Sequence, residues 1–274
     1  MPIRQAWERH GCRMKRLYLV PDGNDIERSV GLAEEYGCAF EFNDFYVPAI
    51  LDDVREQEKI IESYARYRSD FSGDTMHGAF LDVTIHSSDP LIREASIRRI
   101  HQSMRIAKRM GLRGVVFHTG RLSGFRVESY LMQWVDRNFA FFTGLAEEFP
   151  DQQIYMENMF DEAPDIMAVL AERMKGTGNF GICLDYAHAA LYERPQREWV
   201  ETLAPYIRHI HVNDNDLTND LHRPVGTGKI DWDAFDVLMR TNKIDASVLI
   251  EVKGYEEQKQ SLEYMKRRGL YPYR

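Results

Sequence analysis

Six side chains able to bind a metal recur along the chain at intervals of about one β-strand plus one helix. They are His77, His118, Glu157, Asp185, His211 and Glu251, with successive spacings of 41, 39, 28, 26 and 40 residues. Imidazole and carboxylate groups without thiolate are typical ligands of Zn²⁺ and Mn²⁺. Because uncompensated buried charge is costly, a shared cation explains how three carboxylates and several imidazoles occupy one cavity. The spacing therefore predicts a divalent-metal site.

One short stretch concentrates this chemistry. Residues 207–232, IRHIHVNDNDLTNDLHRPVGTGKIDW, contain three histidines and four aspartates. His211 ends a predicted strand, and Asp220 and His222 lie in the loop that follows, which can fold back over the site. His209 lies on the same face of the strand as His211 but one layer deeper, because side chains alternate along a strand. We therefore interpret His209 as a core residue or a support of the metal ligands.

The elements that must position these groups are short β-rich segments alternating with amphipathic helical segments. Strands are predicted at residues 16–20, 38–43, 74–78, 114–118, 154–158, 181–185, 207–213 and 247–252, and helices at 25–36, 92–110, 127–149 and 165–175. Asp231 is the predicted N-cap of a further helix. Eight strands, each followed by a helix, predict an α/β fold, namely a single-domain (β/α)₈ TIM barrel.

In such a barrel the carboxyl ends of the strands form one mouth, where the active site lies. The six ligand candidates all stand at those ends. We assign residues 14–274 to the barrel and residues 1–13 to an N-terminal extension. A doubly wound open sheet is the alternative, but no glycine-rich nucleotide loop follows the first strand.

Composition limits the functional classes. The net charge is −8, which removes the overall positive charge typical of a dedicated nucleic-acid binder, although a local basic patch remains possible. Cys12, Cys38 and Cys183 are far apart, which argues against a disulfide framework and a thiolate zinc site. No apolar run reaches the length of a membrane span, and no secretory leader is recognisable. We expect a cytoplasmic protein without membrane contact.

Other polar residues are candidates for substrate binding. Lys253 follows Glu251 by two positions and, in a strand, would point into the same mouth. Lys253 is suited to an anionic or carbonyl group of a substrate, and equally to neutralising an acidic cavity. Arg223 and Arg121 are further candidates for an anionic group, although ordinary surface charge is the favoured interpretation for both. His188 lies just beyond a strand end, in CLDYAH.

His86 and His101 are predicted to be structural or exposed residues, and two aromatic residues are predicted to have structural roles. His86 follows the third strand by too many residues to reach the site, His101 lies inside a predicted helix, and His10 belongs to the N-terminal extension. We expect Trp232 and Phe42 to pack in the core rather than to stack on a sugar.

Several motifs resemble the xylose isomerase-like TIM-barrel superfamily, which includes sugar phosphate isomerases and epimerases and the class II apurinic/apyrimidinic (AP) endonucleases. They are VVFHTG, YMEN, CLDYAH, IHVND with DLHRPVGTGKIDW, and LIEVKG, and the resemblance runs from about residue 14 to the last helix. The resemblance implies a TIM barrel with a divalent metal. Relatives are often dimers or tetramers, which implies a possible homo-oligomer.

The two branches of this superfamily imply different ligand sets. By resemblance to the epimerases, Glu157, Asp185, His211 and Glu251 hold one ion, usually Mn²⁺, and the two glutamates also move protons. By resemblance to the endonucleases, three Zn²⁺ ions are held by nine residues: His77, His118, Glu157, Asp185, His188, His211, Asp220, His222 and Glu251. All nine are present, so one to three ions are expected.

The loops depart from the endonuclease pattern. GAFLDV follows His77 where that branch has a tyrosine-containing stretch, and NDFYVPAI and TGRLSGF lack the insertions that contact DNA. We therefore favour a metal-dependent isomerase or epimerase of a sugar or sugar phosphate, with Glu157 and Glu251 as the catalytic residues and His188 on a substrate hydroxyl. The alternative is a zinc-dependent AP endonuclease or phosphodiesterase, for which nucleic acid is the partner. A non-catalytic metal-binding barrel is the third hypothesis.

Overall fold

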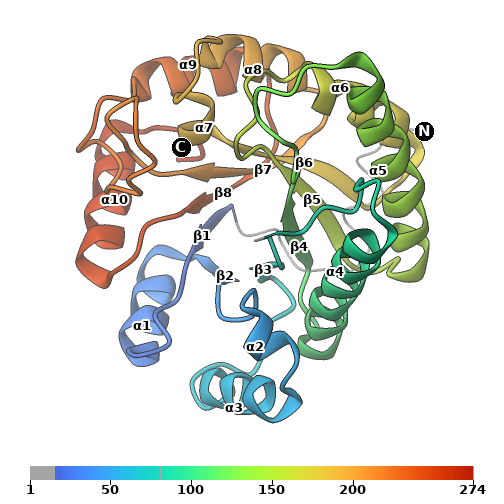
Figure 1. The fold of residues 1–274 in the computed structure, drawn as a ribbon. Helices are drawn as coiled ribbons and strands as arrows, with labels where there is room; N and C mark the ends of the chain where they lie inside the picture. The colour runs from blue at the N-terminus through green and yellow to red at the C-terminus, as the bar shows by residue number, and fades with distance from the viewer. Residues whose placement is uncertain (1–15, 81, 274) are drawn as a thin grey trace.

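The computed structural model describes residues 16–80 and 82–273, which form a closed barrel of parallel strands surrounded by helices (Figure 1). The strands are β1 (Leu17–Leu19), β2 (Ala39–Phe42), β3 (Thr75–His77), β4 (Gly114–His118), β5 (Gln153–Glu157), β6 (Phe180–Asp185), β7 (Ile207–Val212) and β8 (Ser247–Ile250). Each strand pairs with the next, and β8 pairs with β1. The predicted TIM barrel is thus confirmed, and the closure of the sheet excludes the doubly wound alternative.

The helices follow the strands in chain order. They are α1 (Ile26–Tyr36), α2 (Pro48–Leu51), α3 (Val54–Ala65), α4 (Pro90–Met110), α5 (Glu128–Glu148), α6 (Asp165–Arg173) with the 3₁₀ helix η2 (Met174–Gly176), α7 (Tyr186–Ala189), α8 (Gln196–Leu203), α9 (Trp232–Thr241) and α10 (Tyr255–Arg268). None of the helices in the described part of the chain combines the length and apolar character of a membrane span.

Local sequence explains where several helices begin and end. The Asp231 side chain accepts a hydrogen bond from the Ala234 amide, which confirms it as the N-cap of α9. Asp25 caps α1 in the same way, and Gly37 ends α1 with a φ of 70°, a conformation in which a glycine has no Cβ to clash. The proposed extension at residues 1–13 lies outside the described residues.

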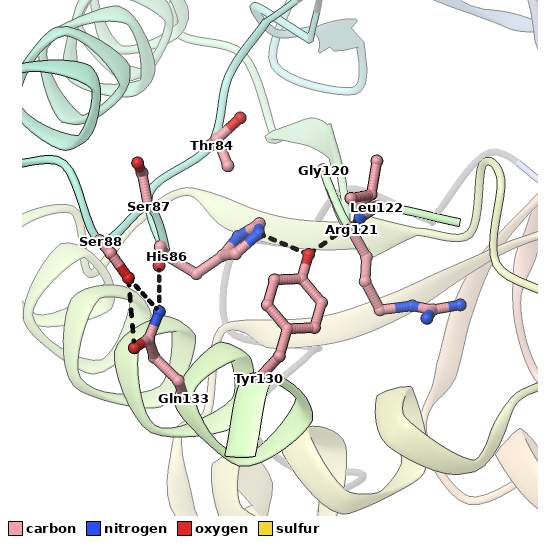
Figure 2. A pocket seen from close by; sticks show the side chains of 9 residues that line it. All are labelled: Thr84, His86, Ser87, Ser88, Gly120, Arg121, Leu122, Tyr130 and Gln133. Carbon is pink, nitrogen blue, oxygen red and sulfur yellow. Dashed lines mark hydrogen bonds between the residues drawn. The ribbon is translucent and has the colours of Figure 1, made fainter. Parts of the chain in front are cut away.

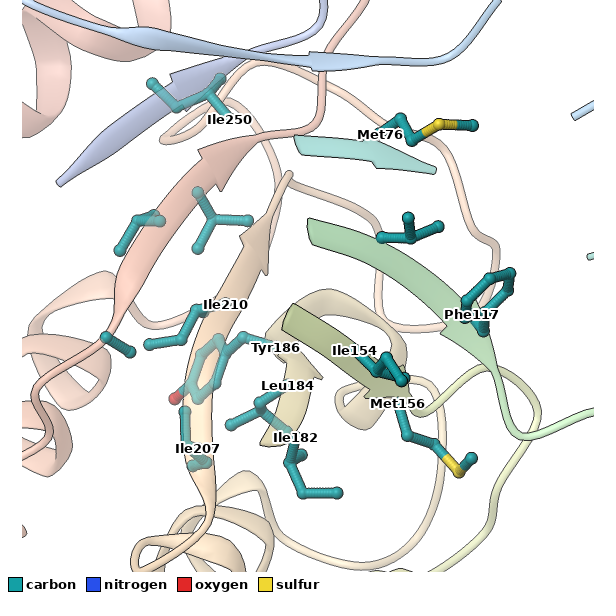
Figure 3. Packing of buried hydrophobic residues seen from close by; sticks show 14 of the residues in the cluster. Met76, Phe117, Ile154, Met156, Ile182, Leu184, Tyr186, Ile207, Ile210 and Ile250 are labelled. Carbon is teal, nitrogen blue, oxygen red and sulfur yellow. The ribbon is translucent and has the colours of Figure 1, made fainter. Parts of the chain in front are cut away.

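Side-chain alternation along the strands separates two environments. On β5, Ile154 and Met156 are buried against the surrounding helices, in the large core cluster that Figure 3 shows in part. Tyr155 and Glu157 point the other way, into the barrel. Phe42 and Trp232 are also buried in the large cluster, which confirms their predicted packing role. The strands therefore deliver every second side chain to the interior, where polar groups gather near the carboxyl end.

Candidate metal centre

The six predicted strand-end ligands lie together at the carboxyl end of the barrel. His77, His118, Glu157 and Asp185 are the last residues of β3, β4, β5 and β6, His211 is the penultimate residue of β7, and Glu251 directly follows β8. Strand register brings them level, since His118 pairs with Glu157 and Asp185 pairs with His211. Their side chains form groups in which the potential ligand atoms lie within 4.8 Å of one another.

The central group consists of Glu157, Asp185, His211 and Glu251. The Nδ1 atom of His211 lies 3.2 Å from Glu157 Oε1 and 3.4 Å from Glu251 Oε2. Within the described residues, His211 Nδ1, Asp185 Oδ2 and Glu251 Oε2 are buried without a hydrogen-bond partner. Buried polar atoms normally have partners, and three orphans converging on one point fit a divalent cation.

A second group is formed by His77, His118 and Glu157. The two Nε2 atoms are 3.1 Å apart, and each lies 3.3 Å from Glu157 Oε2. Ligands about 2.0 Å from a tetrahedral zinc are separated by about 3.3 Å. The three atoms therefore match one triangular face of a zinc coordination sphere.

The third group contains His188 from α7 and two residues of the loop after β7. Asp220 Oδ2 lies 3.4 Å from His188 Nε2 and 3.1 Å from His222 Nε2. His222 has a φ of 44°, which is uncommon for a residue with a side chain, so the surrounding loop must hold it there. The structure thus brings all nine residues of the predicted endonuclease-type set into three adjoining groups.

Glu157 joins the first two groups. Its Oε1 faces His211, and its Oε2 faces His77 and His118. Each oxygen of Glu157 thus belongs to a different group, so Glu157 would be a ligand in either group if a cation were bound there. The residues fit either a single central ion or a cluster.

Backbone carbonyls orient three of the ligand histidines. The Nδ1 atoms of His77, His188 and His222 lie 3.0, 2.9 and 2.9 Å from the carbonyl oxygens of Gly78, Asn158 and Glu251. A carbonyl only accepts, so each Nδ1 carries the proton and each Nε2 keeps its lone pair for a metal.

His211 has the opposite orientation, with Nδ1 toward the metal position. Its Nε2 lies 3.0 Å from Oε1 of Glu41, a fully buried residue of β2, in an ion-pair contact. Glu41 Oε2 also accepts a hydrogen bond of 2.7 Å from Thr75 and lies 3.1 Å from His209 Nε2. Glu41 therefore favours the proton on Nε2 of His211 and leaves Nδ1 free to bind.

Glu41 was not predicted as a site residue, because it lies inside β2 rather than at the end of a strand. The signal was present, since Glu41 is a carboxylate inside an otherwise apolar strand, Ala39–Phe42. His209 is confirmed as a buried interior residue, with its Nδ1 2.6 Å from Ser247 Oγ and its Nε2 in contact with Glu41.

The close packing of buried ionisable groups shifts several pKa values in the site. Burial raises the pKa of the Asp185 carboxyl to about 7, and Glu251 and Glu157 add to this effect. Burial alone would raise the pKa of Glu157, but His211 and His118 hold it well below its usual range. Burial likewise opposes protonation of His222, yet Asp220 and Glu251 raise its pKa to about 9. Protons thus partly replace the positive charge that a metal would bring.

Two buried side chains hold the ligand-bearing loops. Asn158 donates to the Asp185 carbonyl and accepts from the Asp185 amide, both at 2.9 Å, which fixes the start of α7. Asp214 accepts from the amides of Gly226 and Ile230 and from Trp232 Nε1, at 2.9, 3.2 and 2.8 Å. Neither role was predicted from the sequence.

The remaining predicted residues are not part of the three ligand groups. Lys253 and Arg223 are exposed, and Lys253 falls beyond the end of β8, so strand alternation does not fix its direction. Arg121 Nε donates to Asp161 at 2.8 Å in a buried ion pair. His101 lies in α4 and contacts Glu148, as a structural role predicts, while His86 is buried rather than exposed and lines a cavity.

Comparisons with known proteins agree with this architecture. The sequence model of a family described as xylose isomerase-like TIM barrel matches residues 30–268. An uncharacterized protein of Methanocaldococcus jannaschii is 28% identical over 207 residues, which are 70% of this chain and 68% of that protein. An apurinic-apyrimidinic endonuclease of Caenorhabditis elegans is 23% identical over 218 residues, 70% of this chain and 54% of that protein.

A solved structure shares the fold over nearly the whole chain. It belongs to a D-tagatose 3-epimerase-like protein and superimposes with a TM-score of 0.73 at 22% identity, covering 92% of this chain and 96% of that one.

Proposed function

The chain belongs to the xylose isomerase-like TIM-barrel family, and on this premise we propose that it is a divalent-metal-dependent isomerase or epimerase acting on a sugar or sugar phosphate. The observation that carries the proposal is the position of Glu157 and Glu251. They come from different sides of the barrel, yet both approach His211 Nδ1, at 3.2 and 3.4 Å. Two carboxylates flanking one ligand position suit removal and return of a proton.

The chemistry of such a reaction matches these side chains. A bound divalent cation polarises a substrate carbonyl and makes the neighbouring C–H bond more acidic. Asp185 and His211 hold the cation in this proposal. One of the two glutamates accepts the proton from carbon on its carboxylate oxygen, and the other glutamate, protonated, delivers a proton to the opposite face.

Other residues of the mouth are assigned to substrate binding. His188 is 3% exposed and reaches the site from α7, where its Nε2 is available to a substrate hydroxyl when Asp220 does not engage it. Lys253 and Arg223 are exposed and adjoin the ligand residues Glu251 and His222 in sequence. We propose that they meet an anionic substituent of the substrate. The fold of the D-tagatose 3-epimerase-like protein is consistent with a sugar substrate.

The proposal is tested by exchange of substrate protons with solvent. The metal-loaded protein is incubated in D₂O with ketoses and ketose phosphates, and deuterium at the carbons next to the carbonyl is followed by NMR. We expect Glu251→Gln to slow exchange by about 100-fold or more, since general acid–base catalysis contributes about that factor. Glu256→Gln, an exposed residue paired with Arg28, is the matched control. Exchange by Glu251→Gln at the wild-type rate would refute the assignment.

A second candidate function is hydrolysis of a phosphodiester at an abasic site. The observation in its favour is the arrangement of nine ligand residues in three adjoining groups, two of which share Glu157. Clustered metals activate water and stabilise the leaving oxygen. The match to the AP endonuclease of C. elegans points the same way.

Metal content separates the two candidates. About three zinc ions per chain in protein purified without added metal, together with cleavage of abasic duplex, would favour hydrolysis. Binding to that duplex should then fall steeply with salt. About one ion, together with deuterium exchange and no cleavage, would favour the isomerase or epimerase.

A further inference from the structure

A cavity of about 410 Å³ lies at the same end of the barrel as the metal centre (Figure 2). Its walls are Thr84 and residues 86–88 after β3, residues 120–122 after β4, and Tyr130 and Gln133 of α5. The volume falls in the range of about 300–1,000 Å³ typical of small-molecule sites. Both loops follow strands that end in ligand residues, His77 and His118.

The lining of this cavity is rich in hydrogen-bond donors. Thr84, Ser87 and Ser88 contribute hydroxyl groups. Tyr130 and Gln133 also line the cavity, but the Tyr130 hydroxyl contacts His86 Nε2 and the Gln133 amide donates to the His86 carbonyl and to Ser88 Oγ. Among the described residues that form the walls, none is an aspartate or glutamate. The absence of carboxylates from this lining contrasts with the chain as a whole, which has 43 acidic and 35 basic residues. An anion in the cavity would therefore not be repelled by a carboxylate of the lining.

Two arginines place positive charge behind the wall. Arg93 Nη1 donates to the Ser87 carbonyl at 2.8 Å, and Arg137 Nη1 donates to the His86 carbonyl at 2.9 Å and to the same Ser87 carbonyl. Within residues 16–80 and 82–273, the hydrogen bonds of both guanidinium groups go to these backbone carbonyls and none goes to a carboxylate. Arg121 in the lining differs, because Asp161 compensates its charge.

His86 has a buried ring nitrogen without a hydrogen-bond partner. The side chain is buried, its Nε2 lies 3.1 Å from Tyr130 Oη, and its Nδ1 has no hydrogen-bond partner among the described residues. Burial and the charges of Arg137 and Arg121 lower the pKa of His86 to about 4, so the ring is neutral near pH 7.

The hydrogen bonds of Tyr130 permit a tautomer of that ring in which Nδ1 is the donor. Tyr130 Oη accepts from the Leu122 amide at 2.9 Å, and its own hydrogen is available to His86 Nε2. In this tautomer the single ring proton of His86 lies on Nδ1. Figure 2 shows this ring between the hydroxyl-bearing residues of one loop and Tyr130.

We propose that this cavity binds a phosphate group, either as part of a phosphorylated sugar substrate or as free phosphate. A phosphate oxygen only accepts hydrogen bonds at its ionised positions, so it satisfies the unpaired donor of His86 and the lining hydroxyls. Its negative charge is stabilised by the uncompensated guanidinium groups of Arg93 and Arg137. The anion site itself does not depend on the function proposed above; only its use by a substrate rests on that function.

The test uses the metal-loaded full chain and inorganic phosphate as the probe. Phosphate should raise the unfolding temperature in a saturable way, whereas chloride at equal ionic strength should not. We expect His86→Phe, which removes the donor, and Arg93→Met, which removes one charge, each to weaken the apparent Kd for phosphate by about tenfold or more. Arg105→Met is the matched control, since Arg105 is exposed on the same helix, α4.

The outcomes are separable. Competition between phosphate and a sugar-phosphate substrate would place the substrate's own phosphate in the cavity, and saturable binding without competition would identify a free-phosphate site. Either result supports the proposal, and the second needs no turnover. Three results would overturn it: no stabilisation beyond that of chloride, an unchanged Kd in both His86→Phe and Arg93→Met, or binding that disappears on chelation because phosphate sits on the metals. Metal content is measured in every variant.

Discussion

Replacement of Glu41 by glutamine should weaken metal binding at the central group without disturbing the barrel. Glutamine has nearly the same shape and keeps an oxygen to accept the hydrogen bond from Thr75. It has no negative charge, however, and its NH₂ group can face His211 Nε2, which lies 3.0 Å from Glu41 Oε1. A facing donor favours the proton on Nδ1 of His211, where it blocks the lone pair that a metal needs.

The size of the effect follows from the role of such supporting groups. Loss of a partner behind a metal-binding histidine commonly weakens metal affinity by about 10-fold to 100-fold, or about 1.4 to 2.8 kcal/mol. Glu41 is fully buried and contacts both His209 and His211, so solvent does not screen its charge. We therefore expect the upper half of this range.

Metal affinity is measured by competition with a chromophoric chelator, and the visible spectrum of the Co²⁺-substituted protein reports on the geometry of the ligands. Glu58→Gln is the control, because Glu58 is an exposed glutamate paired with Arg109. We expect a weaker affinity and an altered Co²⁺ spectrum for Glu41→Gln alone. If that variant binds metal as tightly as the wild type with the same spectrum, the support attributed to Glu41 is wrong.

Two further predictions concern other parts of the structure. Gly228→Ala should reduce the number of metal ions bound, because a Cβ there would lie 2.2 Å from Asp214 Oδ1 and displace the ligand-bearing loop. Gly144→Ala is the control, since the position of its Cβ is surrounded by open space, and it should leave the metal content unchanged. Elemental analysis of both variants measures the metal content. Lowering the pH from about 6.5 to 4 should cost stability through His86, whose pKa is lowered to about 4 by burial and by Arg137. In the unfolded chain the histidine has a pKa of about 6.5 and binds a proton at a higher pH than in the folded protein. The free energy of unfolding therefore falls by an amount on the order of 3 kcal/mol over this pH range. Urea unfolding should show a smaller pH dependence in His86→Phe, and an equal slope in both proteins would contradict this account.

Much of the site was predictable because the repeating unit of the barrel constrains it. A run of strand and helix brings each strand end to the same mouth, so an imidazole or carboxylate at a strand end becomes a candidate ligand without any knowledge of contacts. His118, Asp185 and Glu251 were predicted in this way, and all three lie at the carboxyl ends of their strands in the structure. The capping role of Asp231 was also readable, since an N-cap depends only on residues a few positions away.

Contacts between residues far apart in the chain could not be predicted from the sequence. Glu41 and His211 are separated by most of the barrel along the chain, and their contact depends on which side chains share a layer of the interior. The short helix α7, which carries His188, is too brief to produce a periodic signal. The cavity beside His86 arises where two loops and α5 meet, and loops carry no such periodicity.

The sequence by itself determined the barrel, the strand ends and the kinds of ligand that gather there, because strand and helix periodicity are properties of local sequence. Only the tertiary structure decided that Glu157 is shared between two ligand groups, that His211 presents Nδ1 while other ligand histidines present Nε2, and that Asp214 anchors the loop of Asp220. These facts depend on distances and directions between side chains from different strands and loops, which become fixed when the barrel closes and its interior packs.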